Sequence, residues 1–270
     1  MPEGDTIHTL AGALRRELLG RRLERVEVRG RRVPSLASEV VAVEARGKNL
    51  LLTLGTGEAI RVHLGMSGDW HRYSERARSW RKSPARATLV LHTGDRVIVC
   101  FDAEELELVE ASRLARSRGL RTLGPDLISG PASAEVLVRR ARHFLHPTAP
   151  VVDLLLDQRV AAGIGNVYKS ELLFLEGIAP RTPIGALDDE RIASLYQLAA
   201  RLLRANVGGV RRVTTGEPGG ARGARPPLWV YRRVGEPCLR CGTRIEFTRL
   251  GRDRRGTYWC PSCQEPAARR

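Results

Sequence analysis

The chain has 270 residues, enough for one large domain or two medium ones. Lys and Arg number 45 against 30 Asp and Glu, so the formal net charge is +15. Nucleic acid is the first partner to consider, although a solvated, arginine-rich surface would give the same balance. No apolar run is long enough to span a bilayer and the polar start is not a secretory signal, so we expect no membrane partner and a cytoplasmic location.

The first half of the chain predicts one helix followed by a β-sandwich. Apolar residues recur at helical spacing over residues 5–19, with Asp5 or Thr6 as the candidate N-cap and Gly20 as the end. Cys100 lies in an apolar run, where a buried core thiol is expected. Short β-type runs separated by turn residues occupy 22–29, 40–46, 50–54, 59–64, 88–91, 97–101 and 106–110.

Helical patterns replace the strands after residue 131. The predicted helices occupy 134–144, 151–157, 167–176 and 188–206. A stretch at 214–227 is rich in Gly, Pro and Arg and predicts a loop. We therefore expect an α+β multidomain chain: residues 1–124 form the helix and β-sandwich, 131–213 a helical domain, 214–235 a loop and connector, and 236–270 a small cysteine-containing domain.

Four cysteines near the C-terminus have the spacing of a structural zinc site. Two C-x2-C pairs, separated by eighteen residues, are formed by Cys238, Cys241, Cys260 and Cys263. Two such turns on a β-hairpin present four thiolates to one tetrahedral Zn²⁺, and four thiolates leave no open position for catalysis. A small polar tail of this kind has too little apolar area to fold without the metal. We expect one structural zinc ion.

A second motif, Gly163-Ile164-Gly165-Asn166, lies between two predicted helices. Its glycines allow a sharp turn whose backbone amides and following helix N-terminus could bind a phosphate. A helix–helix turn ending in a C-cap glycine explains the same residues equally well. Lys169, one of three lysines in the chain, lies one turn into the following helix.

Four separated motifs together resemble the formamidopyrimidine-DNA glycosylase/endonuclease VIII family. They are the start Met1-Pro2-Glu3-Gly4-Asp5, the turn Gly47-Lys48-Asn49, the run from Asp157 and Gln158 through Gly163-Ile164-Gly165-Asn166 to Glu171, and the ending Arg255-Gly256-Thr257-Tyr258-Trp259-Cys260. Together these motifs extend over nearly the whole chain, and their order and spacing make the resemblance specific. The resemblance implies a helix–two-turn–helix element in the helical domain and a C-terminal β-hairpin zinc finger.

The resemblance also implies a mechanism. Removal of Met1 would give Pro2 a free secondary amine, the nucleophile that attacks the sugar C1′, expels the damaged base and leads to strand cleavage. Glu3 would be the acid/base and Lys48 a third catalytic residue that holds a phosphate or assists ring opening. DNA-binding roles are implied for Asn166 and Arg255, which flank the lesion, for Lys169, and for Met66, an intercalating wedge for which a core methionine is the alternative.

The Pro-Glu-Gly start resembles the endonuclease VIII branch, which removes oxidised pyrimidines. One departure is Thr6, where many relatives carry an acidic residue, and the 214–227 loop lies where the purine-specific branch folds a lid. We expect a monomer in the bacterial cytoplasm or nucleoid that acts on damaged, double-stranded DNA. The alternatives are a purine-specific (8-oxoguanine or formamidopyrimidine) glycosylase, a non-catalytic damage-binding relative, and an unrelated zinc-ribbon protein that handles nucleic acid.

Overall fold

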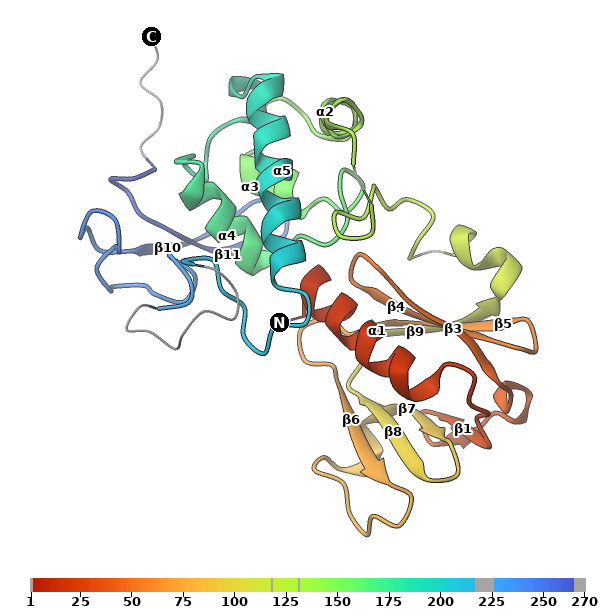
Figure 1. Ribbon diagram of the computed structural model, residues 1–270. Helices are drawn as coiled ribbons and strands as arrows, with labels where there is room; N and C mark the ends of the chain where they lie inside the picture. The colour runs from red at the N-terminus through yellow and green to blue at the C-terminus, as the bar shows by residue number, and fades with distance from the viewer. Residues whose placement is uncertain (1, 118, 131, 217–225, 265–270) are drawn as a thin grey trace. The chain divides into compact units, whose positions relative to one another are not determined.

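The computed structural model describes residues 2–117, 119–130, 132–216 and 226–264. The chain forms two compact units, Met1–Arg121 and Thr122–Arg270. Each unit has its own hydrophobic core and is described separately (Figure 1). The expected combination of a helix with a β-sandwich, a helical domain with a helix–two-turn–helix element, and a C-terminal hairpin is confirmed.

The first unit is a helix packed on a sandwich of two antiparallel sheets. One sheet has the strand order β2-β1-β7-β8-β6 and the other β3-β4-β5-β9. The strands are β1 (Arg25–Val28), β2 (Arg31–Arg32), β3 (Val40–Arg46), β4 (Asn49–Leu54), β5 (Glu58–His63), β6 (Asp69–Ser74), β7 (Ala87–His92), β8 (Arg96–Phe101) and β9 (Glu105–Glu110). Cys100 is fully buried in the core between them, as expected.

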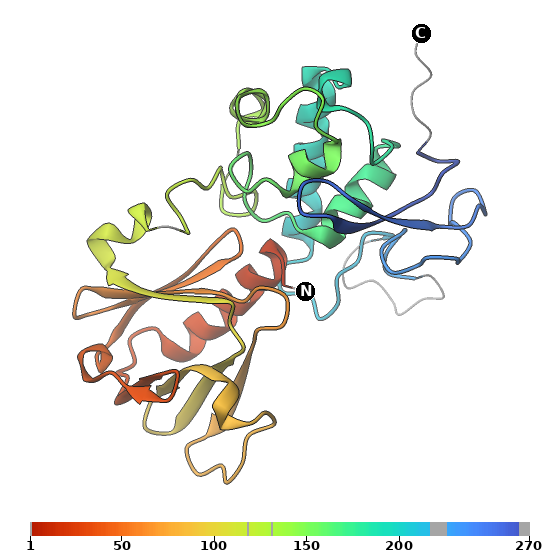
Figure 2. The same ribbon diagram turned by 180° about the vertical axis from the view of Figure 1, so that it is seen from behind.

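Helix α1 (Gly4–Leu18) forms because its apolar positions recur on one face, which is buried against the sandwich. Its C-terminal end lies beside the start of β3, where Leu19 bridges Val40, and the Arg15 Nε donates to the Val43 carbonyl at 2.9 Å. The helix therefore runs antiparallel to β3, and its first turn lies at the end where β3 turns into β4 (Figures 1 and 2). That edge of the sheet carries the candidate active site.

Three sequence predictions for this unit were wrong in detail. Strands β2 and β6 were missed, because both are short or polar edge strands with little apolar alternation. The N-cap of α1 is Glu3, with Asp5 and Thr6 already inside the first turn. Asp5 is buried there, and the Thr6 hydroxyl donates to its carboxylate at 3.3 Å.

The second unit packs four helices around one core and adds a two-stranded hairpin. The helices are α2 (Ala134–Phe144), α3 (Val151–Leu156), α4 (Asn166–Leu175) and α5 (Asp189–Ala205), and the hairpin consists of β10 (Glu246–Leu250) and β11 (Arg255–Trp259). Helices α3 and α4 form the helix–two-turn–helix element. The hairpin lies beside α4 in both views (Figures 1 and 2).

A buried carboxylate in α4 holds the base of the 214–227 loop. Glu171 is fully buried and accepts hydrogen bonds from the Thr214 hydroxyl and from the amides of Trp229, Val230 and Tyr231. Burial raises the pKa of this carboxyl, while the hydrogen bonds act in the opposite direction. Residues 217–225, where the lid-like role was considered, lie outside the described residues. Within the described ranges, no helix is long and apolar enough to cross a membrane.

Candidate active site and nucleic-acid interface

The start of the chain places Pro2 and Glu3 directly before α1. Pro2 is partly exposed, while Glu3 is fully buried in extended conformation at the N-cap position, with φ −129° and ψ −174°. The Glu3 side chain does not serve as the capping group of the first turn. The buried carboxyl group of Glu3, next to Pro2, is suited to proton transfer at that residue. Met1, whose removal the mechanism needs, lies outside the described residues.

Lys48 lies on the tight turn between β3 and β4, next to Gly47, whose φ of 60° favours glycine. A buried guanidinium, Arg61, braces this turn. It donates to the Asn49 amide oxygen at 2.8 Å, to Glu105 at 2.6 Å and to Glu107 at 2.8 Å. These bonds join β4, β5 and β9 and neutralise acidic charge close to Lys48, so that a phosphate is not repelled there.

His63 belongs to the same end of the sheet and was not identified as a site residue from sequence. It pairs in register with Asn49 on one side and Glu105 on the other. Its Nδ1 is buried and finds no hydrogen-bond partner in the described part of the chain. Burial lowers the pKa of the imidazole, and the cations Lys48 and Arg61 add to this against Glu104 and Glu105. The neutral imidazole lies next to Lys48, and its Nδ1 has no hydrogen-bond partner among the described residues. This nitrogen can therefore form a hydrogen bond with a ligand.

Met66 lies on the turn that follows β5, and therefore also at this end of the sheet. The Gly68 amide donates to the Leu64 carbonyl at 3.0 Å and closes the turn, and Gly65 has a φ of 63°. Met66 is 66% exposed, so the alternative of a core methionine is wrong. The topology thus brings the first turn of α1, Lys48, His63 and the Met66 turn to one edge of the first unit.

In the second unit, Asn166 and Arg255 lie close together. The Asn166 Nδ2 donates to the carbonyl of Gly256, the residue after Arg255, at 2.8 Å. Asn166 is the first residue of α4 and is partly exposed, and Arg255 is exposed at the start of β11. The two residues come from different elements, and this hydrogen bond keeps the start of α4 beside the start of β11.

Lys169 does not present its charge to solvent, contrary to the expected direct contact with DNA. Its side chain is fully buried, and Nζ donates to Asn166 Oδ1 at 2.7 Å, to the Gly256 carbonyl at 2.9 Å and to Thr257 Oγ1 at 2.7 Å. All three ammonium protons are thus directed at acceptors within the unit. The lysine links α4 to the hairpin.

The glycine turn before α4 is held together by one side chain. Gln158 donates through Nε2 to the carbonyls of Leu156 and Ile164, at 2.9 and 3.0 Å, and its Oε1 accepts from the Gly163 amide at 3.1 Å. Gly163 has a φ of 117°, which favours glycine. The Gly163 amide is therefore used inside the turn, and the turn's contribution at this surface is to place Asn166.

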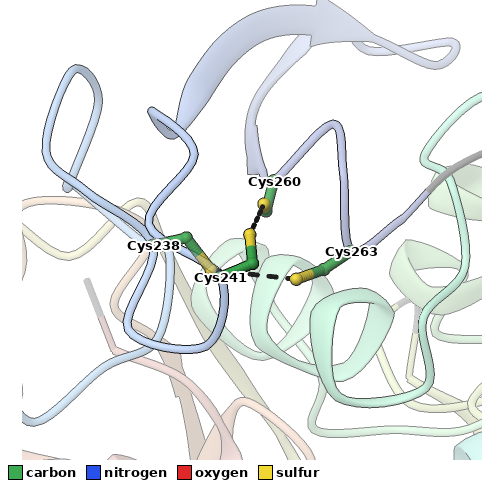
Figure 3. Close-up of side chains that lie close together, drawn as sticks. All are labelled: Cys238, Cys241, Cys260 and Cys263. Atoms are coloured by element: carbon green, nitrogen blue, oxygen red, sulfur yellow. Dashed lines mark hydrogen bonds between the residues drawn. The ribbon is translucent and has the colours of Figure 1, made fainter.

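The four cysteines form a candidate metal centre (Figure 3). Their sulfur atoms all lie within 4.8 Å of one another. Cys238 and Cys263 are 3.9 Å apart, and Cys241 and Cys260 are 3.5 Å apart. A tetrahedral zinc ion with Zn–S bonds of about 2.3 Å needs sulfurs about 3.8 Å apart, so the cluster fits this metal.

Comparison with known proteins decides the family. Residues 1–116 match the formamidopyrimidine-DNA glycosylase N-terminal domain, residues 123–215 its H2TH domain, and residues 235–266 the zinc finger found in FPG and IleRS. The chain is 40% identical to the DNA-(apurinic or apyrimidinic site) lyase Nei2 of Mycolicibacterium smegmatis over 98% of this chain and 99% of that protein. The chain belongs to the formamidopyrimidine-DNA glycosylase/endonuclease 8 family.

Two further likenesses agree with this family. A probable endonuclease 8 2 of Streptomyces coelicolor is 39% identical over 100% of this chain and 96% of its own length. The structure of Lactococcus lactis Fpg in complex with DNA containing N7-benzyl-Fapy-dG superposes with a TM-score of 0.81 at 22% identity, covering 98% of this chain and 100% of that chain. Membership of the family confirms the predicted resemblance and excludes an unrelated zinc-ribbon protein.

Proposed function

We propose that this family member is a bifunctional DNA glycosylase and AP lyase of base excision repair, which removes oxidised bases and prefers oxidised pyrimidines. The observation that carries the proposal is the joint placement of Pro2, the buried Glu3 and Lys48 at one edge of the first unit. The preference for pyrimidines is supported by the Pro-Glu-Gly start and by relatives that are named endonuclease 8 and Nei2.

In the proposed reaction, removal of Met1 leaves Pro2 with a secondary α-amine, part of which is neutral near pH 7. Its nitrogen attacks the sugar C1′ as the C1′–base bond breaks, and the departing base takes up a proton. The product is an aminal at C1′. Its C1′–O4′ bond then opens, O4′ takes up a proton, and an iminium ion remains at C1′. This electron sink acidifies the C2′ proton, whose loss expels the 3′ phosphate. A further elimination expels the 5′ phosphate.

The surrounding residues supply protons and hold the backbone. Glu3 is proposed to protonate the sugar ring oxygen or the departing base. Lys48 is proposed to hold a phosphate of the damaged strand, with the neutral His63 beside it. In the second unit, Asn166 and Arg255 grip the phosphates flanking the lesion, because extrusion of a nucleotide costs a few kcal/mol that such contacts must offset.

Damaged double-stranded DNA is the proposed partner, and a monomer in the bacterial cytoplasm is the proposed state. Met66 would fill the gap that the extruded nucleotide leaves in the stack. One zinc ion, held by Cys238, Cys241, Cys260 and Cys263, would keep the finger folded. A four-thiolate site supplies structure and takes no part in bond breaking.

The test is to trap the imine. Purified protein is incubated with a duplex containing one abasic site, borohydride is added, and the adduct is mapped. We expect a covalent adduct at Pro2. Substitution Pro2→Gly should lower base excision and strand nicking about 100-fold, because the secondary amine is lost, while the Kd for DNA changes less than about threefold.

Leu19→Ala, at the far end of α1, is the matched control and should trap as the parent protein does. Unchanged nicking by Pro2→Gly would refute the nucleophile assignment. No adduct from protein shown to lack Met1 would mean a non-catalytic damage-binding relative. A panel of duplexes with one oxidised pyrimidine or one 8-oxoguanine decides the branch, and faster excision of the purine would overturn the pyrimidine preference.

A further inference from the structure

Lys169 is a fully buried cation whose three protons all have acceptors. Removing an ammonium group from water is costly unless each proton is hydrogen-bonded. An apolar side chain of the same length would fill this space without that desolvation penalty. The hydrogen bonds themselves are therefore what the lysine contributes at this position, and they converge on Asn166 and the residues after Arg255.

The ammonium group determines which way the Asn166 amide faces. Because a lysine has donors and no acceptor, the atom that it meets must be the amide oxygen, Oδ1, at 2.7 Å. The Nδ2 group is then turned the other way and gives one proton to the Gly256 carbonyl at 2.8 Å. Among the described residues no acceptor takes its second proton, which is available to a bound phosphate. With the amide flipped, an oxygen would face that position and repel a phosphate.

The same ammonium group fixes the backbone that follows Arg255. The Gly256 carbonyl accepts from both Lys169 and Asn166, and the Thr257 hydroxyl accepts from Lys169. The two bonds that Lys169 donates to β11 span 87 and 88 positions of the sequence and join the first turn of α4 to this strand. Movement of β11 away from α4 would break them together. The spacing between the Asn166 amide and the Arg255 backbone is thus set by one buried side chain.

We propose that Lys169 is a positioning residue for the phosphate-binding pair Asn166 and Arg255. It acts by locking the Asn166 amide with its N–H group outward and by holding β11 against α4, and it does not contact DNA itself. This inference rests on the proposed function, in which Asn166 and Arg255 bind backbone phosphates. It replaces the direct DNA contact predicted for Lys169 from the sequence.

The experiment is a double-mutant cycle in the full-length, zinc-loaded protein. Lys169→Met keeps an unbranched side chain, one atom shorter, and removes the donors. We expect its Kd for a duplex with a tetrahydrofuran abasic-site analogue to rise about tenfold. The KM of the reaction with abasic-site DNA should rise by the same factor. The kcat at saturating DNA should stay within about threefold of the parent. Added to Asn166→Ala, Lys169→Met should weaken binding by clearly less than tenfold, because only its hold on the Arg255 backbone is then left to lose.

Losses that multiply in the double variant would overturn the proposal, because Lys169 would then act independently of Asn166. Thr257→Val is the matched control: it removes one acceptor of the ammonium group and leaves the bond to Asn166, so binding should stay within about twofold of the parent even if the melting temperature falls. A loss in Thr257→Val equal to that in Lys169→Met would show a merely structural effect and would also overturn it.

Asn166→Asp keeps the inference testable if Lys169→Met fails to fold. The carboxylate retains an acceptor for Lys169 but turns an anionic oxygen outward, so it should bind DNA more weakly than Asn166→Ala. Binding equal to or tighter than that of Asn166→Ala would overturn the outward N–H group. If Asn166→Ala itself binds as the parent does, both this inference and the phosphate role of Asn166 fail, whereas the Pro2 adduct is still measured separately.

Discussion

At the scale of single residues, Met66 is a large apolar side chain that is mostly exposed to solvent. It exposes 66% of its surface on a turn closed by a hydrogen bond between Gly68 and Leu64. An apolar thioether held in water gains free energy when it enters an apolar environment. The stacked bases beside an extruded nucleotide provide such an environment. The turn is closed by its own backbone, so it can carry the side chain without support from the core.

Met66→Ala should therefore separate function from stability. We expect the free energy of unfolding to change by less than about 0.5 kcal/mol, because the side chain is exposed. Base excision from a lesion-containing duplex should fall about tenfold, because nothing fills the gap. Leu108→Ala, a change at another exposed apolar residue of the same unit, is the control. Excision by Met66→Ala at the parent rate would rule out the wedge.

Two residues show where sequence reasoning stops at this scale. The motifs placed Met66 on a turn, as found, and Asn166 at the end of a turn, where it is the first residue of α4. Lys169 was assigned to the DNA-binding surface because its burial depends on strand β11, which starts 86 positions later, at Arg255. Arg61 was missed because an arginine within an apolar strand gives no sign of partners such as Glu105, 44 positions away. A polar residue in an otherwise apolar β-run was the only available signal.

At the scale of elements, the finger has a very small core of its own. Its buried residues cluster with Phe174 of α4, and Arg240, in the first cysteine turn, lies over the rings of Phe174 and Trp229 at 4.7 and 5.8 Å. The cation–π contacts and the Phe174–Trp229 stack attach the finger to α4. They do not replace a metal, because four thiolates crowded within 4.8 Å repel one another unless a cation lies between them.

Cys260→Ser should release zinc and weaken DNA binding at least about tenfold, because β11 and Arg255 lose their support. Zinc content by mass spectrometry and Kd by fluorescence anisotropy are the measurements. Ser262→Ala, in the same turn but without a ligand, should keep both zinc and affinity. Full affinity in protein verified to lack zinc would refute a structural role for the metal.

Elements were predictable where periodicity was strong. Helix α2 was expected at 134–144 and is found at Ala134–Phe144, because Leu137 and Ala141 are buried and Val138 and Phe144 pack, partly buried, against the same core. The start of α1 was misjudged, since Asp5 has the side chain of a good cap but is buried within the first turn of the helix. Edge strand β6 was missed because its exposed, polar positions carry no alternation that a sequence could reveal.

At the scale of the whole molecule, charge is distributed over both units. The exposed arginines Arg76, Arg78 and Arg81 of the first unit and Arg249 and Arg254 of the second carry no ion pair among the described residues. The net charge of +15 indicated a polyanionic partner from composition alone. Composition does not identify which of the basic residues face that partner. That depends on burial, as Lys169 shows, and burial is a property of the fold.

The salt dependence of binding distinguishes these cations. Five exposed or partly exposed cations, Lys48, Arg249, Arg252, Arg254 and Arg255, are the candidates for phosphate contacts, and five contacts predict a Kd that rises about 500-fold between 50 and 200 mM salt. Arg255→Ala should lower the slope of log Kd against log salt by about one. Lys169→Met should weaken binding at every salt concentration and lower the slope by clearly less than one, because it disturbs the neutral Asn166 amide and leaves the Arg255 side chain in place. Arg139→Ala, an exposed site on α2, is the control for charge alone. A slope lowered equally by Lys169→Met and Arg255→Ala would mean that the buried ammonium group reaches a phosphate after all.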